Sequence, residues 1–172
     1  MTVMQSINTV KEDRWSYLWL AIGSLLFVVG NGRWAIPLAA WLWPAFMLRF
    51  TRTQKPVWGF LIVAVVFMVG CNIQWIDIMQ GPIFIILNAV MGMVLVATFL
   101  IDRIITPRFK GILSTLVFPL TWTTMEYLRS FGPFGSWGSV AYTQFGNLPL
   151  EQMVSVTGIY GITFLITWFA AV

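Results

Sequence analysis

The side chains best suited to chemistry lie between residues 126 and 165. This stretch gathers ionisable, hydroxyl, amide and aromatic groups in a chain that is otherwise mostly apolar. Glu126 and Arg129 are three positions apart, so on a helix they share one face. They could form an ion pair, since most charges inside membranes are paired. Alternatively, Arg129 could bind an anionic headgroup, for which a planar guanidinium is suited. The two interpretations are compatible if Glu126 orients Arg129.

Three further polar side chains in this stretch, Trp137, Tyr142 and Gln144, are candidate lipid-binding residues. Trp and Tyr are also common anchors at membrane–water interfaces, and that is the alternative interpretation. Gly158 and Gly161 predict close packing between helices, because small residues let two backbones approach.

The sequence excludes several catalytic classes. It contains no histidine and a single cysteine, Cys71, which lies within an apolar run. Ser–His and Cys–His catalysis and histidine-based zinc sites are therefore excluded. No nucleophile–base pair, phosphate loop or metal-ligand cluster can be assembled from the remaining side chains. We expect no catalytic residue, no metal and no cofactor in this chain.

Composition indicates an integral membrane protein. The chain is 59% hydrophobic and only 9% charged, whereas soluble domains contain about 25% charged residues. We predict an all-α polytopic bundle of about six transmembrane segments, near residues 17–29, 34–48, 57–75, 83–101, 112–128 and 153–172. Residues 1–16 are expected to form a polar tail, and residues 17–172 the membrane domain.

The first two segments are predicted to form a short helical hairpin. One helix over residues 17–48 would be about 48 Å long, which exceeds a hydrocarbon core of about 30 Å. The Gly-Asn-Gly sequence at 30–32 provides the turn. Whether the two arms span the membrane or re-enter it stays open at this point. The last segment is still apolar at residue 172, so we expect the chain to be cut from a longer protein.

Basic residues predict the orientation. Eight of the ten Lys and Arg residues fall in the N-terminal tail and in the loops at 49–56 and 102–110, whereas Arg33 and Arg129 fall on the opposite side. The positive-inside rule therefore places the N-terminus in the cytoplasm. Topology accounts for the basic residues, so we expect no nucleic-acid partner.

Four motifs carry a resemblance to a known family: Glu126-Tyr127-Leu128-Arg129, Phe134-Gly135-Ser136-Trp137, Ala141-Tyr142-Thr143-Gln144 and Gly158-Ile159-Tyr160-Gly161-Ile162-Thr163-Phe164-Leu165. In this order they resemble motifs of the apolipoprotein N-acyltransferases. The opening hairpin and the polar end of the third segment are similar as well. The sequence departs from the family where Gly-Ser-Trp replaces Phe-Pro-Trp and Ala-Tyr-Thr replaces Gly-Tyr-Ser.

The resemblance implies a bacterial cytoplasmic-membrane protein that takes part in lipoprotein biosynthesis. Its substrates would be a membrane phospholipid and a diacylglyceryl lipoprotein. In that family a nitrilase-like extracytoplasmic domain with a Glu-Lys-Cys triad transfers the acyl chain, and this triad is not in the sequence. We expect the chain to guide lipid substrates toward such a domain of the same protein and to be inactive alone. The alternative is a non-enzymatic membrane module that binds a partner through Gly158 and Gly161.

Overall fold

The computed structural model describes residues 13–78 and 81–172, and every regular element in these two ranges is a helix. The elements are α2 (Ser16–Val29), α3 (Pro37–Thr53), α4 (Pro56–Trp75), α5 (Pro82–Ile105), η1 (Thr106–Arg108), α6 (Ile112–Arg129), η2 (Val140–Gln144), α7 (Leu148–Thr157) and α8 (Ile159–Ala171). The predicted all-α membrane fold is thereby confirmed. Most of the predicted N-terminal tail, up to residue 12, lies outside the described residues.

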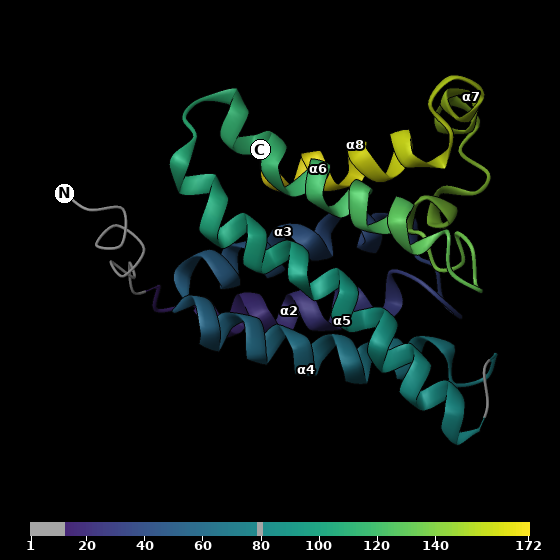
Figure 1. Cartoon of the computed structure of the whole chain (residues 1–172), viewed down its shortest axis with the longest axis horizontal. Coiled ribbons are helices and arrows are strands. Elements are labelled where there is room, and N and C mark those ends of the chain that lie inside the picture. The colour runs from purple at the N-terminus through teal and green to yellow at the C-terminus, as the bar shows by residue number, and fades with distance from the viewer. Residues whose placement is uncertain (1–12, 79–80) are drawn as a thin grey trace.

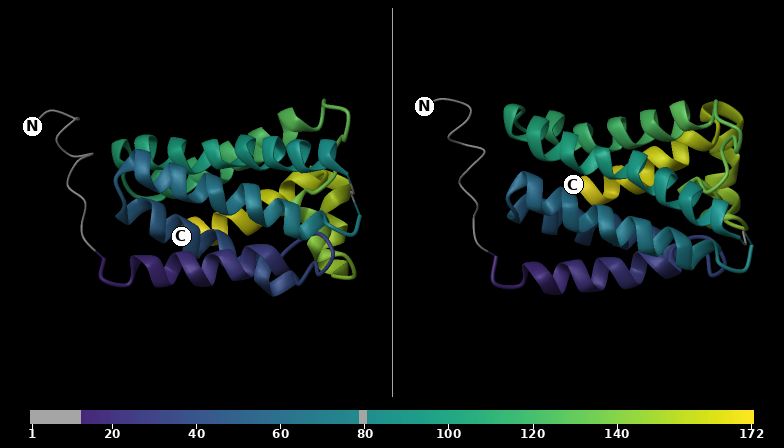
Figure 2. Two further views of the ribbon diagram at one scale, coloured as in Figure 1. Left: turned by 90° about the horizontal axis from the view of Figure 1, so that it is seen from below. Right: turned by 60° about the horizontal axis from the view of Figure 1, so that its bottom comes forward.

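The helices form a bundle along one long axis (Figures 1 and 2). The connections α2–α3, α4–α5 and α6–α8 all lie at the same end, together with α7. Prolines at the first position of α3, α4 and α5 help to fix where these helices begin, because a proline there needs no hydrogen-bond partner. The hairpin of α2 and α3 has the most extensive helix–helix contact in the bundle.

Within residues 13–78 and 81–172, two helices are long and apolar enough to cross a bilayer: α4, and α5 continued through η1 to Arg108. A third crossing is possible if α7 and α8 are counted as one broken span, while α2 is a shorter apolar helix. With 14 residues, α2 is about 21 Å long, against about 30 Å for a hydrocarbon core.

The predicted single segment at 153–172 differs from the structure. The chain instead forms α7 and α8, which meet at Gly158 and are bent by 118°. Gly158 adopts a φ of 63°, a left-handed conformation that ends α7 and that glycine accepts more readily than other residues. Its N–H still donates to the carbonyl of Val154 at 2.9 Å, so α7 ends with a closed turn.

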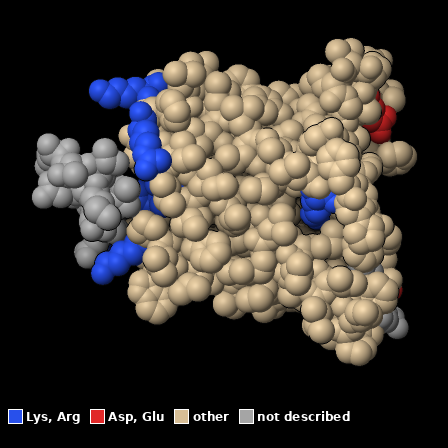
Figure 3. Space-filling model, in the orientation of Figure 1, with Lys and Arg blue, Asp and Glu red and all other residues tan. Residues whose placement is uncertain are grey.

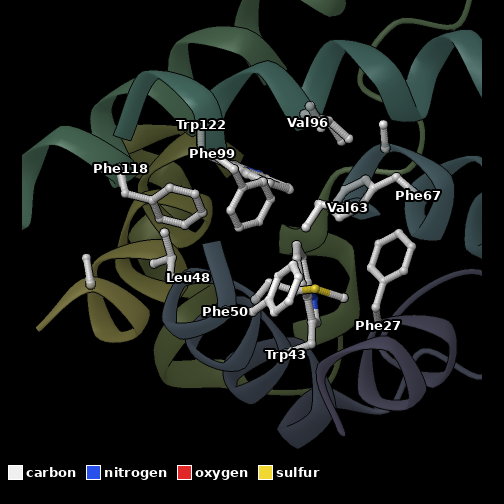
Figure 4. Packing of buried hydrophobic residues seen from close by; sticks show 14 residues of the cluster. Phe27, Trp43, Leu48, Phe50, Val63, Phe67, Val96, Phe99, Phe118 and Trp122 are labelled. Carbon is white, nitrogen blue, oxygen red and sulfur yellow. The ribbon is translucent and has the colours of Figure 1, made fainter. Parts of the chain in front are cut away.

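An aromatic cluster joins five helices at the centre of the bundle (Figure 4). Neighbouring rings lie between 4.3 and 6.5 Å apart, in stacked and edge-to-face arrangements. The cluster consists of Phe27, Trp43, Phe67, Phe99, Phe118 and Trp122. Two of the ten tryptophans are therefore core residues here rather than interfacial anchors, and Trp122 also reaches the candidate site described below.

Charge is unevenly distributed along the bundle. On the face shown in Figure 3, basic side chains gather at the end opposite α7. At that end Arg52 of α3 forms an ion pair with Asp102 of α5. Near the other end, an exposed ion pair joins Arg33 and Asp77.

Candidate functional site

Glu126 is the most highly coordinated side chain at the α7 end of the bundle. It lies in the last turn of α6 and is only 2% exposed. Its Oε2 accepts hydrogen bonds from the hydroxyls of Ser139, at 2.7 Å, and Thr163, at 2.9 Å. Its Oε1 accepts from the indole N–H of Trp122 and the backbone N–H of Val140, both at 3.2 Å. Four donors therefore surround this carboxylate.

These contacts hold the loop after α6 in place. Ser139 and Val140 belong to that loop, and Thr163 belongs to α8, so one carboxylate joins three parts of the chain. Hydrogen bonds to a charged acceptor are about twice as strong as neutral ones. Glu126 is thus an internal anchor for the segment 130–147, which carries most of the predicted site.

Arg129 does not pair with Glu126. Both residues lie in the described part of the chain, and no ion pair joins them there. Instead, the Nη2 of Arg129 donates to the backbone carbonyl of Trp137 at 3.1 Å. Its Nε is buried without a partner among the described residues. Of the two sequence-based alternatives for this pair, the direct ion pair is absent from the structure.

A cavity of about 50 Å³, measured as the space open to the centres of water molecules, lies beside Arg129. That space is large enough to hold ordered water. Its apolar walls include rings of the central aromatic cluster. Its polar lining residues come from α4, α5, α6 and the α2–α3 turn: Asn31, Gln74, Asn88, Glu126 and Arg129.

A second, wider pocket of about 650 Å³ lies next to this cavity. The two share Asn31, Trp75, Trp137 and Gly138 as lining residues. The rings of Trp75 and Trp137 stand edge to face, with centroids 5.7 Å apart. The Asn31 side chain donates to the carbonyl of Gly138 at 3.0 Å, which ties the α2–α3 turn to the loop. These shared residues lie where an inner cavity adjoins an outer pocket.

The other predicted site residues are distributed around these spaces. Trp137 lines both pockets, and Tyr142 lines the outer one, where its hydroxyl is 2.7 Å from that of Ser136. Gln144 lines neither. It is buried, accepts a hydrogen bond from the indole of Trp41 at 3.0 Å, and so joins η2 to α3.

Gly158 and Gly161 lie at the α7–α8 junction. Gly158 forms the bend, and a Cβ on Gly161 would meet the Thr157 side chain. Packing of a partner helix against these two glycines stays a prediction.

Sequence reasoning missed five polar members of the site: Asn31, Gln74, Asn88, Ser139 and Thr163. The signal for Gln74 was a polar side chain at the end of an apolar run, whereas the two hydroxyls carried no sequence signal of their own. No group of three or more His, Cys, Asp or Glu side chains that could hold a metal ion occurs within residues 13–78 and 81–172.

Comparisons with known proteins show the family of the chain. The model of the apolipoprotein N-acyltransferase N-terminal domain matches residues 6–172. An apolipoprotein N-acyltransferase of Pasteurella multocida is 27% identical over 166 residues, which are 93% of this chain and 28% of the relative. One from Geobacter metallireducens is 47% identical over 58 residues, which are 33% of this chain and 11% of that protein.

No solved structure matches the chain. The chain spans well under a third of the length of the curated relatives that it matches. The match to the family model covers nearly every residue, including the whole candidate site. The chain therefore belongs to the apolipoprotein N-acyltransferase family, to whose N-terminal domain it corresponds.

Proposed function

We propose that this membrane domain receives phospholipid and lipoprotein substrates and guides them to an extracytoplasmic nitrilase-like domain of the same protein. In the family that the sequence resembles, that domain carries the Glu-Lys-Cys triad and makes and breaks the acyl bonds. The domain described here supplies binding and orientation, so it is inactive alone. The relatives' printed name, apolipoprotein N-acyltransferase, supports this choice of reaction.

One observation carries the proposal: Arg129 faces a cavity instead of pairing with its neighbouring acid. Glu126 accepts from four donors, and the Nε–H of the neighbouring Arg129 has no acceptor in the part of the chain that the structure describes. Arg suits anionic oxygen groups because its donors form a planar fork. Trp137 and Tyr142 line the adjoining outer pocket and would contact the substrate, while Gln144 would support the loop from behind.

The proposed location is the bacterial cytoplasmic membrane, with the N-terminus in the cytoplasm. The clustering of basic side chains at the end opposite α7 supports this orientation through the positive-inside rule (Figure 3). The α7 end, with the candidate site, would then face the extracytoplasmic side. That is the side on which the nitrilase-like domain of the family acts.

The test is Arg129→Ala in the complete protein, with Arg33→Ala as the matched control. Arg33 lies near the same end of the bundle but pairs with Asp77 and does not line the inner cavity. Arg129→Ala should reduce acyl transfer from phospholipid far more than it reduces the yield of folded protein. Equal reductions in transfer and yield would contradict the proposal and would indicate a purely structural arginine.

A further inference from the structure

The inner cavity beneath the Trp75–Trp137 pair has a composition that its role in guiding substrates does not by itself explain. We propose that it is a seat for the phosphate group of a membrane phospholipid, held between Arg129 of α6 and Asn88 of α5. The phosphate enters sideways between α5 and α6. This inference rests on the proposed function and specifies which part of the lipid is bound and by which residues.

The charge in the cavity favours an anion. Arg129 is the only basic side chain among the described lining residues. A guanidinium has five N–H donors, and the described residues accept from Nη2 alone. Glu126 also lines the cavity, but both of its oxygens already accept two hydrogen bonds each, which disperses its negative charge.

Asn88 supplies the opposite wall. It is 5% exposed and lines the cavity. The amide N–H₂ can donate two hydrogen bonds, as a phosphate oxygen requires.

The size of the cavity decides which part of a lipid can enter. A space of about 50 Å³ open to the centres of water molecules accommodates a compact group such as a phosphate, whereas two acyl chains are far too long for it. The rest of the lipid therefore stays outside, in contact with the bilayer. The seat selects for the phosphate and is indifferent to the acyl chains.

The route to the seat is visible on the surface. Figure 3 shows basic side-chain atoms set back in a hollow between the surfaces of α5 and α6, toward the α7 end. The cavity is lined from both of these helices, by Asn88 and Met91 of α5 and by Trp122 and Arg129 of α6. The rings of Trp75 and Trp137 lie where the cavity adjoins the outer pocket. A headgroup can thus reach Arg129 from the side while its acyl chains remain in the bilayer.

The experiment measures lipid retained by the purified full chain in detergent, by native mass spectrometry. The probes are dioleoylphosphatidylglycerol and dioleoylglycerol, which has the same chains without the phosphate. Inorganic phosphate forms a third arm. The variants are Arg129→Gln, Asn88→Asp and, as the control, Arg33→Gln. Thermal melting of each variant reports whether it is folded.

We expect the wild-type chain and Arg33→Gln to retain the phospholipid and to discriminate against dioleoylglycerol. Arg129→Gln should weaken retention by about tenfold or more, since a charge-assisted contact is removed. Asn88→Asp keeps the size of the side chain but opposes a phosphate with a second charge, so it should weaken retention as well.

Equal retention in Arg129→Gln and Arg33→Gln would overturn the seat, as would equal retention of the two lipids. Inorganic phosphate that displaces the phospholipid at equal concentration would show that free phosphate is the ligand. If Arg129→Gln does not fold, the retention of phospholipid by Asn88→Asp is the deciding measurement. The results also distinguish a failure of the phosphate seat from a failure of the proposed function. Unchanged retention in Arg129→Gln with lost acyl transfer overturns only the seat, whereas lost retention with unchanged acyl transfer overturns only the proposed function.

Discussion

Arg52 donates two parallel hydrogen bonds to Asp102, from Nε and Nη2, each at 2.9 Å. The Asp102 side chain is fully buried, while that of Arg52 is 34% exposed. Asp102 accepts a third bond from the hydroxyl of Thr106 at 2.6 Å. One carboxylate thus joins α3 to the end of α5, at the basic end of the bundle, as Glu126 joins three segments at the other end.

Asp102→Ala should destabilise the protein by about 3 kcal/mol, the lower end of the range for breaking a buried pair, because Arg52 keeps some contact with solvent. Thermal melting in detergent measures this. Asp77→Ala is the control, since the Arg33–Asp77 pair is about half exposed and should contribute less than about 1 kcal/mol. Equal effects of the two substitutions on the melting temperature would show that the buried Arg52–Asp102 pair stabilises the protein no more than the exposed pair does.

Glu126→Ala should free the loop at 130–147, because four donors lose their acceptor at once. The expected destabilisation is at least about 3 kcal/mol. Limited proteolysis should then cut the loop, which should resist cleavage in the wild-type chain. Glu151→Ala is the matched control, since that exposed carboxylate accepts only from the N–H of Gly146. A loop that stays protected in Glu126→Ala would show that the anchor is dispensable.

Gly32→Ala should reduce the folded yield strongly. Gly32 has a φ of 63°, and an added Cβ would collide with the backbone carbonyl of Gln74 in α4. Gly111→Ala separates the steric clash from the cost of the left-handed backbone conformation. Gly111 has a similar φ of 61°, but nothing lies within 4 Å of the position that a Cβ would take. We therefore expect Gly111→Ala to lose only the conformational contribution, about 1–2 kcal/mol. Similar yields of the two variants would refute the clash.

Asp13 should titrate below its ordinary value. The backbone N–H of Trp15 lowers the pKa of its carboxyl from 3.8, and the Trp19 indole and Arg49 lower it further. A depressed pKa contributes stability that is fully present above about 3.8 and is lost as the pH falls through the lower, folded value. NMR of the Trp19 indole N–H should therefore show one transition below pH 3.8. A transition above pH 3.8 would contradict the lowered pKa of Asp13.

The sequence was informative about the fold because apolar run length and break signals are local. Pro56 and Pro82 mark helix starts within one residue of the predicted boundaries. The break within the last predicted segment could not be predicted for a physical reason: Gly158 lies in an apolar run, and hydropathy carries no information about φ. Only tertiary packing decides that this glycine bends the chain.

The candidate site was predictable in its location but not in its contacts. Glu126 and Arg129 share a helix face, and spacing alone favoured a bond between them. In the structure Glu126 instead accepts hydrogen bonds from Ser139 and Thr163, which lie 13 and 37 positions away in the sequence. Such pairings depend on how the loop and α8 return to α6. Hydroxyl side chains in an apolar sequence do not reveal this.

The bend at Gly158 has a consequence for how the end of the bundle can lie in a bilayer. Because α7 and α8 are bent by 118° where they meet, the two helices cannot both run along the membrane normal. If α8 follows the normal, α7 lies closer to the plane of the bilayer than to its normal. A helix in that position rests at the boundary between headgroups and acyl chains. The candidate site would then be bordered by a helix that lies along the membrane surface.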